Sequence, residues 1–66
     1  MKLTVNGEPR QVPDGATVAQ VVATVTGQTA GVAAAVNGEI VPRHTWPATT
    51  LQDGDQVEVV TAVQGG

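Results

Sequence analysis

The sequence predicts one small α+β domain, in which a mixed sheet of four to five strands packs on a single helix. Three observations predict it: apolar and polar residues alternate near both ends of the chain, two Asn-Gly pairs mark tight turns, and one stretch between them has helical periodicity. A chain of 66 residues has room for one domain and not for two. We place the domain at residues 1–63 and expect residues 64–66 to form a flexible tail.

The N-terminal segment predicts a β-hairpin. Residues 1–5 alternate between apolar and polar side chains, as in a strand with one buried face. Asn6-Gly7 then predicts a type I′ turn, because both central positions of that turn need positive φ. The second strand runs from about Glu8 to Val12. Since Pro9 cannot donate a ladder hydrogen bond, we expect this strand at a sheet edge.

The next segment predicts an amphipathic helix. Thr17 followed three residues later by Gln20 is typical of a capping box, so the helix begins here. Its apolar stripe consists of valines at i, i+3, i+4 and i+7, namely Val18, Val21, Val22 and Val25. Gly27 is placed to end the helix in the left-handed conformation.

A second hairpin follows the helix. Residues 32–36 form a compact apolar run, which predicts a buried strand. Asn37-Gly38 repeats the turn signal of the first hairpin, and Ile40-Val41 continues as a short strand that Pro42 ends.

The C-terminal third predicts an irregular stretch and then a long strand. Residues 43–50 show no regular pattern, and we expect Trp46 to cap the core from there. Leu51 returns to the core, residues 52–55 form a turn, and residues 56–63 alternate as the last strand. With the helix as crossover, the first and last strands form a central parallel pair. This order of elements is the β-grasp arrangement of ubiquitin-like proteins.

The composition excludes several functions. Without cysteine the chain has no disulfide and no thiolate nucleophile, and with His44 as its one histidine we expect no metal site. A net charge of −3, with three basic residues and one aromatic, does not suit nucleic-acid binding. The longest apolar run is too short to span a membrane, so we expect a cytoplasmic protein with no membrane partner. We do not expect an enzyme; a carrier or binding module fits better.

The remaining reactive group is the terminal carboxylate of Gly66. Two glycines after an apolar strand make a thin tail that can enter a narrow channel of another enzyme, so Gly65 and Gln64 would give access to it. The carboxylate is ionised at neutral pH and is a poor electrophile until an ATP-dependent partner converts it to an acyl-adenylate. A sulfur nucleophile then gives a thiocarboxylate or an isopeptide precursor. The alternative is a frayed terminus that happens to end in glycine.

Several segments carry a family resemblance. They are Val36-Asn37, Glu39 to Arg43, Trp46, Leu51 to Val57 and Gly65-Gly66. On these residues the chain resembles the ThiS family, the ubiquitin-like sulfur carriers of thiamin biosynthesis. The resemblance covers nearly the whole chain, although the N-terminal half matches mainly in pattern.

The resemblance implies a cycle with three partners. A ThiF-like adenylating enzyme would use ATP to join AMP to Gly66, and a sulfur relay protein such as a cysteine desulfurase would supply sulfur for a thiocarboxylate. A ThiG-like thiazole synthase would take the sulfur into the thiazole ring. The carrier itself would bind no cofactor, and none of its side chains would act as acid or base.

Such a carrier must dock on its partners in turn. We expect docking on the sheet face away from the helix, where the alternation places Thr4, Ala33, Ala35, Val60 and Ala62. Arg43 is a candidate for a salt bridge to a partner. The alternative is that these are scattered exposed residues of the kind found on any surface.

Other functions remain open. A carrier for molybdopterin synthesis or for tRNA thiolation would use the same tail chemistry. A ubiquitin-like protein modifier would begin with the same adenylate and end in an isopeptide bond. A regulatory or structural β-grasp domain would have an inert tail.

Overall fold

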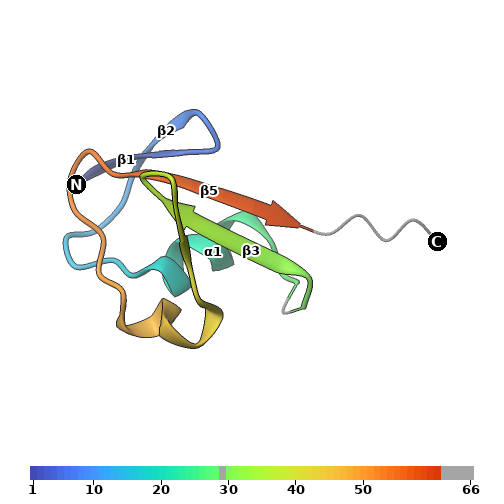
Figure 1. The fold of residues 1–66 in the computed structure, drawn as a ribbon. Helices are drawn as coiled ribbons and strands as arrows, with labels where there is room; N and C mark the ends of the chain where they lie inside the picture. The colour runs from blue at the N-terminus through green and yellow to red at the C-terminus, as the bar shows by residue number, and fades with distance from the viewer. Residues whose placement is uncertain (29, 62–66) are drawn as a thin grey trace.

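The computed structural model of the chain describes residues 1–28 and 30–61. Its elements are β1 (Lys2–Val5), β2 (Glu8–Gln11), α1 (Val18–Val25), β3 (Val32–Val36), β4 (Glu39–Val41), the 3-10 helix η1 (Arg43–Ala48) and β5 (Gln56–Thr61) (Figure 1). The predicted tail at residues 64–66 and the predicted last two residues of the final strand lie outside the described residues.

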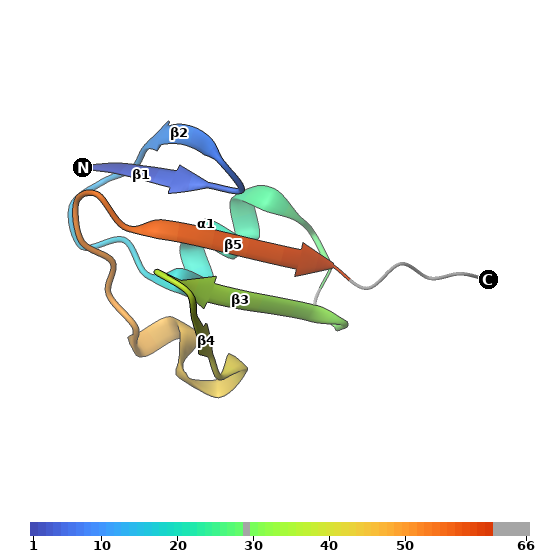
Figure 2. The ribbon, with the colours of Figure 1, turned by 45° about the horizontal axis from the view of Figure 1, so that its top comes forward.

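The five strands form one mixed sheet in the order β2-β1-β5-β3-β4. β1 and β5 run parallel at its centre, and the other neighbours are antiparallel. The helix α1 crosses one face of this sheet (Figure 2). The predicted β-grasp arrangement, with the first and last strands as the central pair, is therefore confirmed.

Both Asn-Gly turns have the predicted geometry. Asn6 and Gly7 have φ values of 50° and 82°, and Asn37 and Gly38 have values of 52° and 85°. Asparagine tolerates the left-handed region because its short amide forms local hydrogen bonds, so the two turns form without strain. β2 lies at the sheet edge as expected from Pro9, and it ends one residue earlier than predicted.

The helix begins as predicted and ends differently. The Thr17 hydroxyl oxygen accepts from the Gln20 backbone N–H at 3.3 Å, and the Gln20 side chain accepts from the Thr17 N–H at 2.9 Å. The prediction that Gly27 ends the helix in the left-handed conformation is wrong. The chain leaves the helix at Thr26 in an extended conformation, with the Thr26 N–H donated to the Val22 carbonyl at 3.1 Å. Gly31, just before β3, has a φ of 70° instead.

The segment predicted as irregular contains a 3-10 helix, η1, and that expectation is corrected. The burial of Trp46 explains why this segment is regular. Trp46 is 7% exposed, and its indole Nε1 donates to the Val41 carbonyl at 2.9 Å. The chain after η1 is tied to the start of α1, because Val18 N–H bonds to the Thr49 carbonyl at 3.0 Å and Leu51 N–H bonds to the Ala16 carbonyl at 2.9 Å. Trp46 thus caps the core as predicted.

The core lies between α1 and one face of the sheet. Its largest fully buried side chains are Leu3, Val5, Val18, Val21 and Val57. The predicted strand at residues 32–36 is confirmed with the same bounds, but the prediction that it is buried is wrong, because within β3 only Ala34 is buried. One helix covers one face of the sheet, so the alternate positions of β3 point to the other face.

Candidate functional site

The sheet face opposite α1 presents apolar side chains from the centre of the sheet. Along β5, Val57 and Val59 point into the core and are 1% and 6% exposed. Glu58 and Val60 alternate with them and point the other way, and Val60 is 63% exposed. The predicted alternation of the last strand is confirmed over the residues described.

Three strands bring their side chains together on this open face. Ala33 of β3 pairs with Val60 of β5, and Ala35 pairs with Glu58 on one side and with Ile40 of β4 on the other. We call Ala33, Ala35, Ile40 and Val60 the open-face patch. Together with Gly38 and Glu58 these residues line a shallow hollow of about 220 Å³. The sequence placed Ala33, Ala35 and Val60 here, and the structure brings all three together.

The patch contains one residue that the sequence reasoning missed. Ile40 is 74% exposed, the highest value among the large apolar side chains described. The sequence does contain a signal for Ile40. Pairing outward from the Asn37-Gly38 turn sets Val36 opposite Glu39 and Ala35 opposite Ile40. Counting the register would have placed Ile40 beside Ala35 on the same face.

Two other predicted residues lie elsewhere. Thr4 is on the open face but lines a separate hollow with Asn6, Gly7 and residues of β5. Arg43 lies at the start of η1, and its guanidinium carbon is 5.7 Å from the centroid of the Trp46 ring. It borders a groove between α1 and η1, on the helix side of the sheet. Arg43 therefore does not join the open-face patch, and its salt bridge to a partner stays a prediction.

The predicted reactive terminus has no described geometry. Ala62, Gln64, Gly65 and Gly66 all lie outside the described residues. What the structure does give is the strand that precedes them. β5 is the central strand of the sheet, paired with β1 on one side and with β3 on the other.

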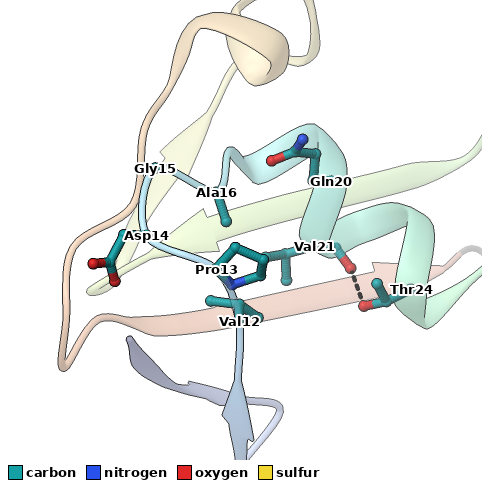
Figure 3. Close-up of a pocket in the computed structure, with 8 residues that line it drawn as sticks. All are labelled: Val12, Pro13, Asp14, Gly15, Ala16, Gln20, Val21 and Thr24. Carbon is teal, nitrogen blue, oxygen red and sulfur yellow. Dashed lines mark hydrogen bonds between the residues drawn. The ribbon is translucent and has the colours of Figure 1, made fainter.

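A further hollow lies between the β2–α1 loop and the helix (Figure 3). Its lining includes Val12, Pro13, Gln20 and Val21, and the Thr24 hydroxyl donates to the Val21 carbonyl at 2.7 Å. Asp14 is the one ionisable residue of the lining; its side chain is 94% exposed and bonds to the N-terminal amine of Met1 at 3.1 Å. The one hydroxyl of the lining is thus held by a backbone carbonyl, and the lining offers no set of metal ligands.

Residues 1–28 and 30–61 contain no group of three or more His, Cys, Asp or Glu side chains that would hold a metal ion. Within the same residues, no helix is long and apolar enough to cross a membrane. Asp55 acts as a turn residue, because it accepts from the Gln52 N–H at 2.8 Å. Asp53 ties this turn to β1 by accepting from the Lys2 N–H at 2.7 Å.

A model of the ThiS family matches residues 3–66. The chain belongs to the ThiS family. It is 35% identical over 66 residues to the sulfur carrier protein ThiS of Escherichia coli K12, and the match covers 100% of both chains. The crystal structure of a thiamine biosynthesis protein (ThiS) from Geobacter metallireducens has a TM-score of 0.82 and 36% identity, with 100% of both chains covered.

A second kind of relative is much longer. A thiazole synthase of Paramagnetospirillum magneticum is 35% identical over 66 residues, which is 100% of this chain and 20% of that protein. A segment similar to the whole of this chain therefore occurs within one polypeptide that is named for thiazole synthesis.

Proposed function

We propose that this chain is a sulfur carrier of thiamin biosynthesis, and that the terminal carboxylate of Gly66 carries the sulfur. The observation behind this proposal is the family match, which extends over residues 3–66 and so includes Gly65-Gly66. The β-grasp body provides a rigid base for that chemistry, because the strand that precedes the terminus is the central strand of the sheet.

The chemistry has two steps. The Gly66 carboxylate attacks the α-phosphorus of ATP and pyrophosphate leaves, which gives an acyl-adenylate on a ThiF-like partner. A sulfur nucleophile then attacks the carbonyl carbon and AMP leaves; with sulfide as nucleophile, the product is a thiocarboxylate and one proton is released. A relay protein such as a cysteine desulfurase supplies the sulfur in the cell. The need for ATP places this cycle in the cytoplasm.

The acceptor of the sulfur is a ThiG-like thiazole synthase. Support comes from the longer relatives, in which a segment similar to this chain and a thiazole synthase share one polypeptide. Fusion holds two proteins at a high effective concentration, which is useful where the two act on each other. In this proposal the carrier is a co-substrate of both enzymes and itself catalyses nothing.

The open-face patch is the proposed docking surface for these partners. It combines two strongly exposed branched side chains, Ile40 and Val60, with the small Ala33 and Ala35, which leave room for a partner side chain in the hollow. Apolar surface that is exposed on a monomer and removed from water in a complex favours binding. Val60 is also two residues before Ala62, so docking here would hold the body close to the start of the C-terminal segment.

The intact mass of the protein tests the proposal. The full chain is incubated with a ThiF-like adenylating enzyme, ATP and sulfide, and its mass is measured by electrospray. Replacement of one oxygen by sulfur on Gly66, located by fragmentation, is the expected result. No mass change in the presence of an active adenylating enzyme would contradict it.

The choice of pathway needs a second measurement. The loaded carrier is offered to a thiazole synthase and, separately, to the large subunit of a molybdopterin synthase. We expect loss of sulfur in the first reaction only. Transfer in the second reaction, or thiol-resistant conjugates on a denaturing gel, would instead favour a molybdopterin carrier or a protein modifier.

A further inference from the structure

The two Asn-Gly turns of the molecule contact the central strand from its two sides. Asn6 follows β1 and Asn37 follows β3, and these are the two strands that flank β5. Each asparagine backbone N–H donates to β5: Asn6 to the Val57 carbonyl at 2.9 Å and Asn37 to the Gln56 carbonyl at 2.8 Å. Each side chain then adds a contact that the backbone ladder does not make.

The Asn6 amide continues the β1–β5 ladder by one position. Its Oδ1 accepts from the Val59 N–H at 2.8 Å, and its Nδ2 donates to the Val59 carbonyl at 3.2 Å. An asparagine side chain carries an acceptor and a donor on one planar group, as a peptide does, so it can take the place of a strand residue. The register of β1 with β5 ends at Val5 and Val57, so the amide lies where the next backbone partner of β5 would be.

The Asn37 amide acts at the start of β5, three residues before the position that Asn6 contacts. Its Oδ1 accepts from the Gln56 N–H at 2.9 Å, and its Nδ2 donates to Asp55 Oδ1 at 3.0 Å. Both contacts lie where β5 begins, far along the strand from the C-terminal segment. Asn37 therefore makes a matched control, with the same turn and the same kind of contact.

The C-terminal half of β5, residues 59–61, is held unequally on its two sides. β3 pairs with it throughout, up to Val32 opposite Thr61. On the β1 side, the contact within the described residues is the Asn6 amide at Val59. We infer that Asn6 is a positioning residue: it fixes the C-terminal half of β5 and so directs the segment that carries Gly66 toward the partner's reaction centre.

The expected effect on sulfur loading rests on the proposed function. The expected effect on β5 rests only on the hydrogen bonds of Asn6. When the carrier is docked by its open face, its terminus is a reactant tethered to the complex. The rate of adenylation within the complex then depends on the range of orientations that the C-terminal segment can take. Loss of the Asn6 contacts leaves the pairing with β3 in place and loosens the β1 side of Val59. We set the cost at the ordering of about one residue, about 1 kcal/mol, which is about a fivefold lower rate in the complex. Docking itself does not involve Asn6, because the patch is built from β3, β4 and β5.

The test compares Asn6→Gly with Asn37→Gly in the full chain. Glycine keeps the type I′ turn, since it accepts positive φ at either central position, and removes the amide alone. Loading is followed at varied carrier concentration with a ThiF-like enzyme, ATP and sulfide. We expect Asn6→Gly to lower kcat about fivefold with KM unchanged, and Asn37→Gly to leave kcat unchanged.

The split between kcat and KM separates positioning from mere loss of stability. A variant that is only less folded lowers the concentration of active carrier, which raises the apparent KM and leaves kcat as it was. A second readout needs no partner: amide exchange at Val59 should accelerate about tenfold in Asn6→Gly, and the order parameter of the Thr61 amide should fall. Asn37→Gly should change neither.

The inference is overturned if the two variants lower kcat equally, if Asn6→Gly changes only KM, or if the Thr61 amide is unaffected in it. Failure of the proposed function looks different. In that case the unaltered chain takes up no sulfur, while the change at Thr61 in Asn6→Gly still occurs.

Discussion

The indole Nε1 of Trp46 donates a 2.9 Å hydrogen bond to the backbone carbonyl oxygen of Val41, which ties η1 to the end of β4. The ring is 7% exposed and belongs to the core cluster together with Val22 and Leu51. Its other side meets the Arg43 guanidinium. In a core made mostly of valine and alanine, this single aromatic fills the space that η1 encloses.

Replacing Trp46 with phenylalanine should lower the free energy of unfolding by about 1–3 kcal/mol, from the lost hydrogen bond and the smaller buried area. Urea titration followed by circular dichroism measures the change. His44→Ala, at an exposed position of the same 3-10 helix, is the control and should stay within about 0.5 kcal/mol. Equal stability of the two variants would mean that Trp46 does not anchor η1.

Loss of the capping box should weaken α1. Thr17→Ala removes the acceptor of the Gln20 N–H at the start of the helix, and we expect a loss of about 1 kcal/mol in the free energy of unfolding. Thr50→Ala makes the same chemical change at an exposed position whose side chain forms no hydrogen bond with the residues described. A similar loss in both variants in urea titration would count against the cap.

Local signals predicted most of this fold. The Asn-Gly turns, the Thr17 cap and the alternation in β5 depend on neighbours within a few residues, and the structure confirms each of them. The errors are at positions where tertiary contacts decide. Gly27 matched the pattern of a helix end, but the chain leaves the helix at Thr26 in an extended conformation, and Gly31 has the positive φ. In the 3-10 helix, Trp46 packs into the core cluster that includes Val22, and no local pattern reports this packing.

The candidate site was also predictable where local alternation decides it, and not where contacts between distant segments do. The side chains of every strand alternate between the two faces of its sheet. This alternation along β3 and β5 was sufficient to place Ala33, Ala35 and Val60 on one face. Ile40 needed the register across the second turn as well. The Asn6 contact with Val59 joins residues 53 positions apart, so it depends on the sheet order and is not visible in either segment alone.

A charge in the open-face patch should block docking without unfolding the protein. Val60→Arg puts a cation at a position that is 63% exposed, so the folded chain tolerates it, whereas a partner that buries the site would have to desolvate it. We expect KM for adenylation to rise about tenfold or more. Gln11→Arg, on the exposed edge strand β2, is the control; unchanged kinetics in Val60→Arg would exclude the patch.

Ile40 tests whether β4 belongs to the docking surface. Ile40→Ala removes apolar area from a side chain that is 74% exposed, so stability should change little while KM for adenylation rises about fivefold. Glu39→Ala alters the neighbouring position on the same strand, which pairs with Val36, and should leave KM within about twofold. Surface plasmon resonance with the adenylating enzyme gives the affinities directly. Equal effects of the two variants would place the contact elsewhere.

One alanine added after Gly66 should abolish sulfur loading. The extension turns the Gly66 carboxylate into an amide, and an amide carbonyl has no anionic oxygen to attack ATP, so neither the adenylate nor the thiocarboxylate can form on it. The new terminus also places a Cβ where the proposed tail has none. Intact mass after incubation with the adenylating enzyme, ATP and sulfide is the measurement. Gln11→Ala, on the exposed edge strand β2, keeps both length and terminal glycine and should still load, so sulfur uptake by the extended chain would show that the reactive group is not the Gly66 carboxylate.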